Sequence, residues 1–133
     1  MRRNEFIGQI QYRARLSSRE DAVEAARATL TTLTELLLMR EIDRLASGMP
    51  MGAAAFARLS GGVDGLRSLD EFFARVAERE RVELPQAVAH SRAVVGVLVD
   101  NAHPDDVEEL LAQLPDEYLA LFTGAPGEKN GAA

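Results

Sequence analysis

The sequence predicts an all-α protein, a compact helical bundle of about eight helices arranged as two similar four-helix units. Apolar residues recur at helical spacing through most of the chain, and no segment alternates apolar and polar residues as a β-strand does. Segments about 65 residues apart also resemble one another. With 47% hydrophobic and 27% charged residues, the composition is typical of a folded globular protein.

The internal repeat is the most informative pattern. Residues 5–16 match residues 71–82 at a spacing of 66, and after one residue is dropped in the next loop the match continues at a spacing of 65. The matched pairs include Glu5/Glu71, Phe6/Phe72, Ile10/Val76, Arg13/Arg79, Arg15/Arg81, Leu16/Val82, Ala22/Ala87, Arg27/Arg92, Leu33/Leu98, Ile42/Val107, Leu45/Leu110 and Pro50/Pro115. A match that needs a single one-residue shift predicts a duplication.

The duplication gives the predicted domain organisation. We expect one domain over residues 1–122, with residues 1–59 as the first unit and residues 69–122 as the second. The glycine-rich residues 60–68 should link the two units. Residues 123–133 lack apolar periodicity and are predicted to form a disordered tail.

Each unit is predicted to contain a first helix, a long second helix, a third helix and a short fourth helix after Pro50 or Pro115. Start signals support these boundaries, since Ser17 with Glu20 and Ser68 with Glu71 match the capping box. Pro85 and Pro104 suit first helical turns.

The two long helices are unusually apolar, because the runs Leu36–Met39 and Val94–Val99 break their polar faces. A helix that is apolar on most sides must be covered all round. We therefore expect the two long helices to pack on each other in a shared core, with a dimer interface as the alternative.

The residues resemble a known family. The segments FIGQIQYRARLSSREDAVEAARATLTTL, SLDEFFARVAERERVELPQAVAHSRAVVGVL and LLAQLPDEYLALF are similar to the bacterial domain of unknown function 2267 family, over about residues 4–122. The resemblance implies a duplicated all-helical domain with no assigned biochemical activity, so it supplies no catalytic residues. One departure is that GMPMGA of the first unit stands where the second unit has the acidic QLPDEY.

Arg27 and Arg92 are the candidate site residues. Each is spaced to point toward the apolar face of its long helix, where a guanidinium needs an acidic partner. Glu5 and Glu71 repeat in register and are the candidate partners. The pairs predict either a structural ion pair in each unit, which is the more common arrangement, or a twofold anion site. Arg13 and Arg79 also repeat, near the C-terminal end of the first helix of each unit. Positive charge is favoured there by the helix dipole, which accounts for both residues.

The sequence predicts no catalytic residue, no cofactor and no metal site. It has no cysteine, no phosphate loop and no G-x-S-x-G nucleophile motif. His90 and His103 are too far apart for paired metal ligands, and His103 or Asn101 is expected to cap the helix that starts at Pro104.

Charge and the N-terminus limit the function classes. The net charge is −6, with residues 1–66 carrying nine Arg against eight acids and residues 67–133 carrying six basic residues against thirteen acids. An acidic chain is a poor ligand for nucleic acid. The chain has no signal-peptide or membrane-spanning run, so we expect a cytoplasmic protein.

These observations favour a non-catalytic protein-interaction or scaffold module with an unknown protein partner or a second copy of itself. The charge difference between the units would select such a partner. Two alternatives stay open. One is a small-molecule or anion-binding protein that uses Arg27 and Arg92, and the other is a weak nucleic-acid binder that uses the N-terminal arginines Arg2, Arg3, Arg13, Arg15 and Arg19.

Overall fold

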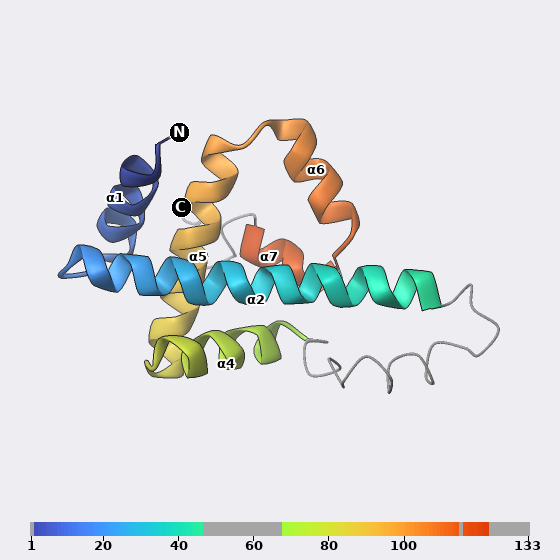
Figure 1. Cartoon of the computed structure of the whole chain (residues 1–133), viewed down its shortest axis with the longest axis horizontal. Helices are drawn as coiled ribbons and strands as arrows, with labels where there is room; N and C mark the ends of the chain where they lie inside the picture. Colours follow the sequence, from blue (N-terminus) through green and yellow to red (C-terminus); the bar gives the residue numbers. More distant parts are fainter. Residues whose placement is uncertain (1, 47–67, 115, 123–133) are drawn as a thin grey trace.

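The computed structural model describes residues 2–46, 68–114 and 116–122, and their regular structure is entirely helical (Figure 1). Within these residues there are six α-helices, one 3₁₀-helix and no β-strand. The helices are α1 (Arg3–Ala14), α2 (Arg19–Ala46), α4 (Leu69–Glu80), α5 (Leu84–Asn101), α6 (Pro104–Ala112), the 3₁₀-helix η1 (Asp116–Tyr118) and α7 (Leu119–Phe122). The predicted all-α class is confirmed.

Some predictions fall outside the described residues. These are the fourth helix of the first unit after Pro50, the linker as far as residue 67 and the tail from residue 123. The count of eight helices and the four-helix composition of each unit therefore stay predictions.

The long helix α2 differs from the prediction of separate second and third helices in the first unit. It runs without a break for 28 residues, or about 42 Å at 1.5 Å per residue. In the second unit, Pro104 separates α5 from α6, because proline cannot continue a helix interior. The aligned residue of the first unit is Met39, and it lets the helix continue.

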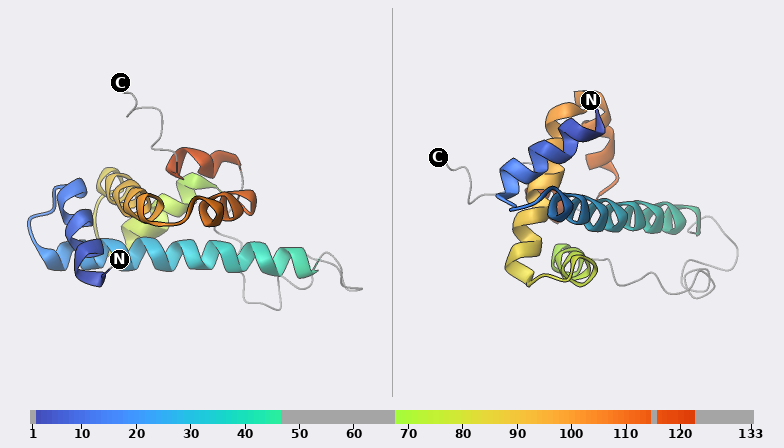
Figure 2. Two further views of the ribbon diagram at one scale, coloured as in Figure 1. Left: turned by 90° about the horizontal axis from the view of Figure 1, so that it is seen from above. Right: turned by 60° about the vertical axis from the view of Figure 1, so that its left-hand side comes forward.

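Helices α1, α4 and α5 pack on α2 (Figures 1 and 2). Helix α5 crosses α2, and both α1 and α4 contact the two long helices. Helix α7 packs against α5. The bundle is thus organised around the crossing of α2 and α5, and the predicted packing of the two long helices is confirmed.

Two apolar clusters form the core. The smaller one joins α1, α2 and α5 through Ile7, Ile10, Ala22, Ala25, Ala26, Val94 and Val97. The larger one includes Leu33, Leu36, Phe72, Val76, Val95, Tyr118 and Leu121. Leu38 is an exception to the expected burial of its run, since it is 57% exposed.

The buried face of α2 is centred on small residues. Its fully buried side chains are Ala22, Ala25, Thr29, Thr32 and Leu36. Helical spacing predicts an apolar stripe of Val23, Ala26, Leu30, Leu33 and Leu37, of which Ala26 and Leu33 are buried and the other three are half-buried. Small side chains permit close helix contact, so here they mark the contact face better than the larger aliphatic ones do.

The helix boundaries follow the spacings of the predicted alignment. Helices α1 and α4 have 12 residues each and start 66 residues apart, whereas α2 and α5 start 65 residues apart. Helices α1 and α4 also end on left-handed residues, Arg15 with φ 56° and Arg81 with φ 63°. Such residues close helices even though L side chains rarely adopt this conformation.

The predicted helix starts are largely correct. The Oγ of Ser68 accepts from the Glu71 amide at 3.1 Å, and the Ser68 amide donates to the Glu71 carboxylate at 2.9 Å, so this capping box is confirmed. In the first unit the prediction of Ser17 is wrong by one residue. Helix α2 begins at Arg19, and Ser18 accepts from the Asp21 amide at 3.0 Å.

In the described residues, none of the helices has both the length and the apolar character that a membrane span requires.

Candidate functional site

A cavity of about 640 Å³ lies where the ends of four helices meet. The last residues of α1 and α4 and the first turns of α2 and α5 form its walls. Its polar lining residues include Arg15, Ser17, Asp21, Glu24, Glu80 and His90. Pockets of roughly 300–1,000 Å³ are usual for small molecules, so the size suits a ligand site.

Tight chain reversals produce this junction. Arg15 and Arg81 end α1 and α4 in the left-handed conformation, and only three or four residues separate each of these helices from the next one. Pro85 then lies in the first turn of α5, where its fixed φ fits the helix and its missing N–H costs nothing. The C-terminal ends of α1 and α4 therefore lie beside the N-terminal ends of α2 and α5.

A buried carboxylate and an imidazole are paired in the cavity wall. Glu80 is the last residue of α4, and its side chain is only 4% exposed. Its Oε2 lies 2.5 Å from Nδ1 of His90, whose side chain is 9% exposed. Its Oε1 is buried and has no hydrogen-bond partner among the described residues. A buried acceptor without a donor costs roughly 1–3 kcal/mol.

The surroundings of Glu80 disfavour its charged form. Burial raises the pKa of Glu80 above its ordinary 4.5, and the carboxylates of Asp21 and Glu24 raise it further, while His90 acts in the opposite direction. Glu80 also lies at the C-terminal, electronegative end of α4. Perturbed ionisable groups of this kind concentrate at functional sites.

Two carboxylates of α2 line the same cavity. Asp21 and Glu24 are exposed and lie three residues apart, so they share one face of the first turns of α2. Ser17 donates to Oδ2 of Asp21 at 3.4 Å, and Arg27 lies 3.7 Å from Glu24. Arg15 contributes a guanidinium to the same cavity. Three carboxylates against one guanidinium make the cavity acidic.

Glu80 and His90 can be compared with the pairs that carry out acid–base chemistry. A carboxylate on Nδ1 of a histidine is the arrangement that orients a general base. A general base also needs a nucleophile or a substrate proton within reach of the imidazole. Ser17 lies in the cavity, but its hydroxyl bonds to Asp21, and in the described part of the chain no hydroxyl bonds to His90. Nor do the described residues contain a group of three or more His, Asp or Glu side chains that could hold a metal ion.

The structure corrects the prediction for Arg27. Its side chain is 63% exposed and contacts Glu24 of the same helix, so it neither points toward the core nor pairs with Glu5. The reason is the placement of the buried face of α2, which is centred on Ala25 and Thr29 and leaves Arg27 on the opposite side. The predicted inward direction of Arg27 is therefore wrong, while an anion-binding role of Arg27 and Arg92 stays a prediction.

Glu5 and Glu71 act at helix starts. The Arg2 amide donates to Glu5 at 3.4 Å, just as the Ser68 amide donates to Glu71. Glu71 thus completes a capping box with Ser68, whereas Glu5 only accepts from the N-cap amide, because the guanidinium of Arg2 has no acceptor. Arg92 is half-buried on α5, and its side chain or backbone is engaged in a contact. Its role as a structural ion-pair or anion position stays a prediction.

Other singled-out residues have structural contacts. The predicted capping role of His103 is confirmed, because its Nδ1 accepts from the Asp105 amide at 3.1 Å. In QLPDEY, Glu117 accepts from the Leu69 amide at 2.8 Å and so caps α4. Arg13 pairs with Asp100, which interrupts the N-terminal arginine stripe that a nucleic-acid site would need.

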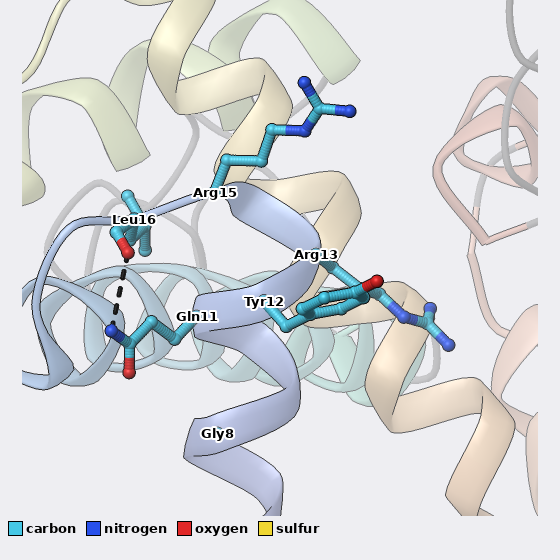
Figure 3. A pocket seen from close by; sticks show the side chains of 6 residues that line it. All are labelled: Gly8, Gln11, Tyr12, Arg13, Arg15 and Leu16. Carbon is cyan, nitrogen blue, oxygen red and sulfur yellow. Dashed lines mark hydrogen bonds between the residues drawn. The ribbon is translucent and has the colours of Figure 1, made fainter.

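A second hollow, of about 630 Å³, lies along α1 (Figure 3). Its lining residues include Gly8, Gln11, Tyr12, Arg13, Arg15 and Leu16. Tyr12 is 85% exposed, and Gln11 donates to the Leu16 carbonyl at 3.4 Å across the end of the helix. This groove is wholly formed by α1 and the turn after it.

Sequence reasoning did not find the pairing of Glu80 with His90. In the predicted alignment, Glu80 stands opposite Ala14 and His90 stands opposite Ala25. An acid and a base thus replace two alanines in one unit, at positions that the fold brings together. That joint departure from the repeat was the available signal.

The fold and the cavity define the class of protein, an all-α helical domain with an acidic cavity at the junction of four helix ends. Residues 3–121 match the family model described as "Uncharacterized conserved protein (DUF2267)", and the chain belongs to this family. The resemblance seen in the sequence is confirmed. Comparison with curated proteins gives no match.

Proposed function

We propose that this protein is a non-catalytic binding domain that takes a positively charged ligand in its acidic cavity. One observation carries the proposal, namely that the carboxylates of Asp21, Glu24 and Glu80 line one cavity of ligand size together with the single guanidinium of Arg15. A positively charged ligand could pair with the exposed carboxylates of Asp21 and Glu24, and its charge would offset the cost of burying Glu80 beside them.

The charge of the walls supports the same choice of ligand. Asp21 and Glu24 add two carboxylates to Glu80, whereas Arg15 is the one guanidinium among the described residues that line the cavity. An anion in this cavity would meet net repulsion. The proposal replaces the anion site expected at Arg27 with a cation site formed by other residues.

A titration of the labelled protein with small cations and anions of matched size tests this function. We expect n-butylamine to shift the backbone amide resonances of residues 14–17 and 86–90 in an NMR spectrum, and butyrate to leave them in place. Glu80→Gln should weaken the shifts, whereas Glu78→Gln should not, because Glu78 is exposed on the same helix and does not line the cavity. Equal responses to the amine and the carboxylate would contradict the proposal.

A second candidate function is the protein-interaction module expected from the sequence. The groove of α1 favours it, because Tyr12 is 85% exposed and aromatic residues are enriched at interfaces. The partner we propose is a second copy of the chain. Its α6 presents the exposed acids Asp105, Asp106, Glu108 and Glu109, which complement Arg15 beside Tyr12.

Sedimentation at several protein and salt concentrations tests this self-association. We expect a reversible dimer at low salt that weakens as salt is added, because the contact is electrostatic. Tyr12→Ser should reduce it, and Leu38→Ser, at an exposed apolar residue of α2 outside the groove, should leave it unchanged. A monomer under all conditions would exclude the dimer.

We also propose that the chain is a duplicated protein whose two units correspond through the 66- and 65-residue spacings. The matching starts of α1 and α4 and of α2 and α5 support this. A cytoplasmic, bacterial setting accompanies the proposal as an expectation.

A further inference from the structure

A buried acid–base pair joins the last turn of α4 to α5. Glu80 ends α4, and its Oε2 lies 2.5 Å from Nδ1 of His90 on α5. The two side chains are 4% and 9% exposed, so the contact is shielded from water. Only residues 81–83 separate the two helices. A change in the charge of this pair therefore acts on the tight turn between α4 and α5.

The surroundings of the pair oppose a net negative charge on it. The pair is neutral while its two groups share one proton, because that proton gives either a carboxyl beside an imidazole or a carboxylate beside an imidazolium. Loss of the proton to water leaves one buried negative charge, and Oε1 of Glu80 has no hydrogen-bond partner among the described residues to stabilise that charge.

The neighbouring charges add to this cost. Among the described residues, the other charged groups that line the cavity around the pair are Asp21 and Glu24 of α2 and Arg15, which follows α1. Two carboxylates outweigh one guanidinium, and the C-terminal end of α4 is itself electronegative. The field at the pair therefore favours the state that keeps the proton.

The same backbone hydrogen bond closes α1 and α4. The Leu16 amide donates to the Gln11 carbonyl at 3.0 Å, and the Val82 amide donates to the Ala77 carbonyl at 3.1 Å. Both bonds join residues five apart, across a helix end that contains a left-handed residue. A hydrogen-bonded amide exchanges its proton with water when the bond opens, so these two amides report whether each helix end is closed.

At the corresponding positions, the end of α1 has no ionisable pair. In the predicted alignment, Ala14 stands opposite Glu80 and Ala25 stands opposite His90. An alanine side chain has no proton to gain or lose with pH. The two helix ends are therefore alike in their closing hydrogen bond and differ in the pair, which makes the end of α1 a reference within the same molecule.

We propose that the pair of Glu80 and His90 is a pH-sensitive contact, which keeps the end of α4 closed while it holds a proton and lets that end open when the proton is lost. This inference goes beyond the proposed function and requires no ligand. Glu80, Val82 and Pro85 line the acidic cavity, so opening of this end changes the wall of the cavity.

The direction of the effect agrees with the raised pKa of Glu80. A group that holds its proton more tightly in the closed form than in the open form stabilises the closed form at low pH. This stabilisation is lost as the pH rises through the raised value, so the end of α4 opens more often at higher pH.

Hydrogen exchange of the full chain, followed by NMR, tests the inference at a series of pH values that begins at 4.5, the ordinary pKa of the Glu80 carboxyl. After correction for the intrinsic exchange rate, we expect the protection of the Val82 amide to fall severalfold as the pH rises, and that of the Leu16 amide to stay constant. Glu80→Gln keeps a hydrogen-bonding group beside His90 but cannot titrate, so the Val82 trend should disappear. Glu78→Gln, at an exposed position of α4, should keep the trend.

Each result supports or overturns the proposal. Equal trends for Val82 and Leu16 in the unchanged protein would overturn it, because a general loss of stability would then explain both. A Val82 trend that persists in Glu80→Gln would also overturn it. If that variant does not fold, the carboxyl carbon resonance of Glu80 in the unchanged protein decides. Its titration midpoint must coincide with the midpoint of the Val82 change, and separate midpoints would exclude Glu80 as the cause.

Discussion

Arg79 of α4 and Glu35 of α2 form an ion pair between the two predicted units, with Nη2 of Arg79 2.5 Å from Oε2 of Glu35. Nη1 of Arg79 also donates to Oγ1 of Thr32 at 3.0 Å. The relationship is reciprocal, because Arg13 of α1 pairs with Asp100 of α5. Arg13 aligns with Arg79 at a spacing of 66, and Glu35 aligns with Asp100 at a spacing of 65. Each unit therefore places an arginine of its first helix on the long helix of the other.

The pair of Arg79 and Glu35 should contribute measurably to stability. Both side chains are partly exposed, at 28% and 37%, so solvent weakens the attraction. We expect a coupling free energy of about 1 kcal/mol in a double-mutant cycle of Arg79→Met and Glu35→Gln, measured by urea unfolding. Arg75 lies 3.5 Å from the same carboxylate, and the cycle of Arg75→Met with Glu35→Gln should give a smaller coupling. Equal couplings would show that Arg79 has no special role.

Two glycines in helices provide a matched pair of substitutions. A Cβ built on Gly8 meets nothing within 4 Å, so Gly8→Ala should raise the free energy of unfolding by about 0.8 kcal/mol through helix propensity. A Cβ on Gly96 meets Nη1 of Arg13 at 2.6 Å, so Gly96→Ala must displace that guanidinium from Asp100. Its gain should therefore be smaller.

The background variant Arg13→Met checks the explanation for Gly96. Without the guanidinium, Gly96→Ala should stabilise the protein about as much as Gly8→Ala does, by roughly 0.8 kcal/mol. Thermal and urea unfolding would measure all four variants. The same small gain for Gly96→Ala with and without Arg13 would mean that the contact does not limit the substitution.

Local chemistry could be predicted well from the sequence. The capping box of Ser68 and Glu71, the cap at His103 and the positions of Pro85 and Pro104 depend on residues that are neighbours in the chain. Such contacts form wherever the helix forms, so they do not require knowledge of the tertiary fold. The all-α class follows from the same local periodicity.

Contacts between distant helices could be predicted only in part. The apolar runs indicated that the long helices pack together, but the face of α2 was misplaced because Ala25 and Thr29 carry little hydrophobic signal. Because of that error Arg27 was predicted to point toward the core, whereas its side chain is 63% exposed. The pairing of Arg79 with Glu35 depends on how α4 lies against α2, and the sequence pattern does not determine this.

The candidate site was missed for a similar reason. Glu80 and His90 lie ten residues apart on different helices, and each looks ordinary on its own helix. The left-handed Arg81 and the short loop after it bring them together. Comparison of the units with each other, rather than each with a motif, would have found the pair.

Tyr118 should stabilise the junction between η1 and α4. It is fully buried, its hydroxyl donates to the Ser68 carbonyl at 2.9 Å, and its ring meets Phe72 edge to face at 5.7 Å. Tyr118→Phe keeps the ring contact and loses the hydrogen bond. We expect a loss of about 1 kcal/mol in the free energy of unfolding at neutral pH, measured with urea.

The same residue should make the protein sensitive to alkali. Burial, followed by the carboxylates of Glu117 and Glu71, raises the pKa of Tyr118 above its ordinary 10. The folded state thus keeps the phenol proton to higher pH than the unfolded chain, and stability is lost as the pH rises above 10. Tyr118→Phe should lose less stability over this range. Parallel declines in both proteins would assign the alkaline loss to other groups.

The raised pKa of Glu80 predicts that its contribution to stability falls as the pH rises. A carboxylate whose pKa is lowered on folding has the opposite effect. Because the folded state holds the Glu80 proton more tightly than the unfolded chain does, the stabilising contribution is fully present below the ordinary pKa of 4.5 and is lost as the pH rises through the folded value. His90, Asp21, Glu24 and Arg15 are the charged or titratable groups that face it.

Glu80→Gln replaces the carboxyl with a neutral group of the same shape, so the variant lacks this loss. We expect the stability of Glu80→Gln relative to the unchanged protein to increase as the pH rises above the ordinary pKa of 4.5, as measured by urea unfolding at a series of pH values. Glu78→Gln, at an exposed position of the same helix, should show no such trend. A relative stability of Glu80→Gln that is flat or decreases with pH would mean that Glu80 ionises as readily in the folded protein as in the unfolded chain, and that His90 alone is sufficient to hold its charge.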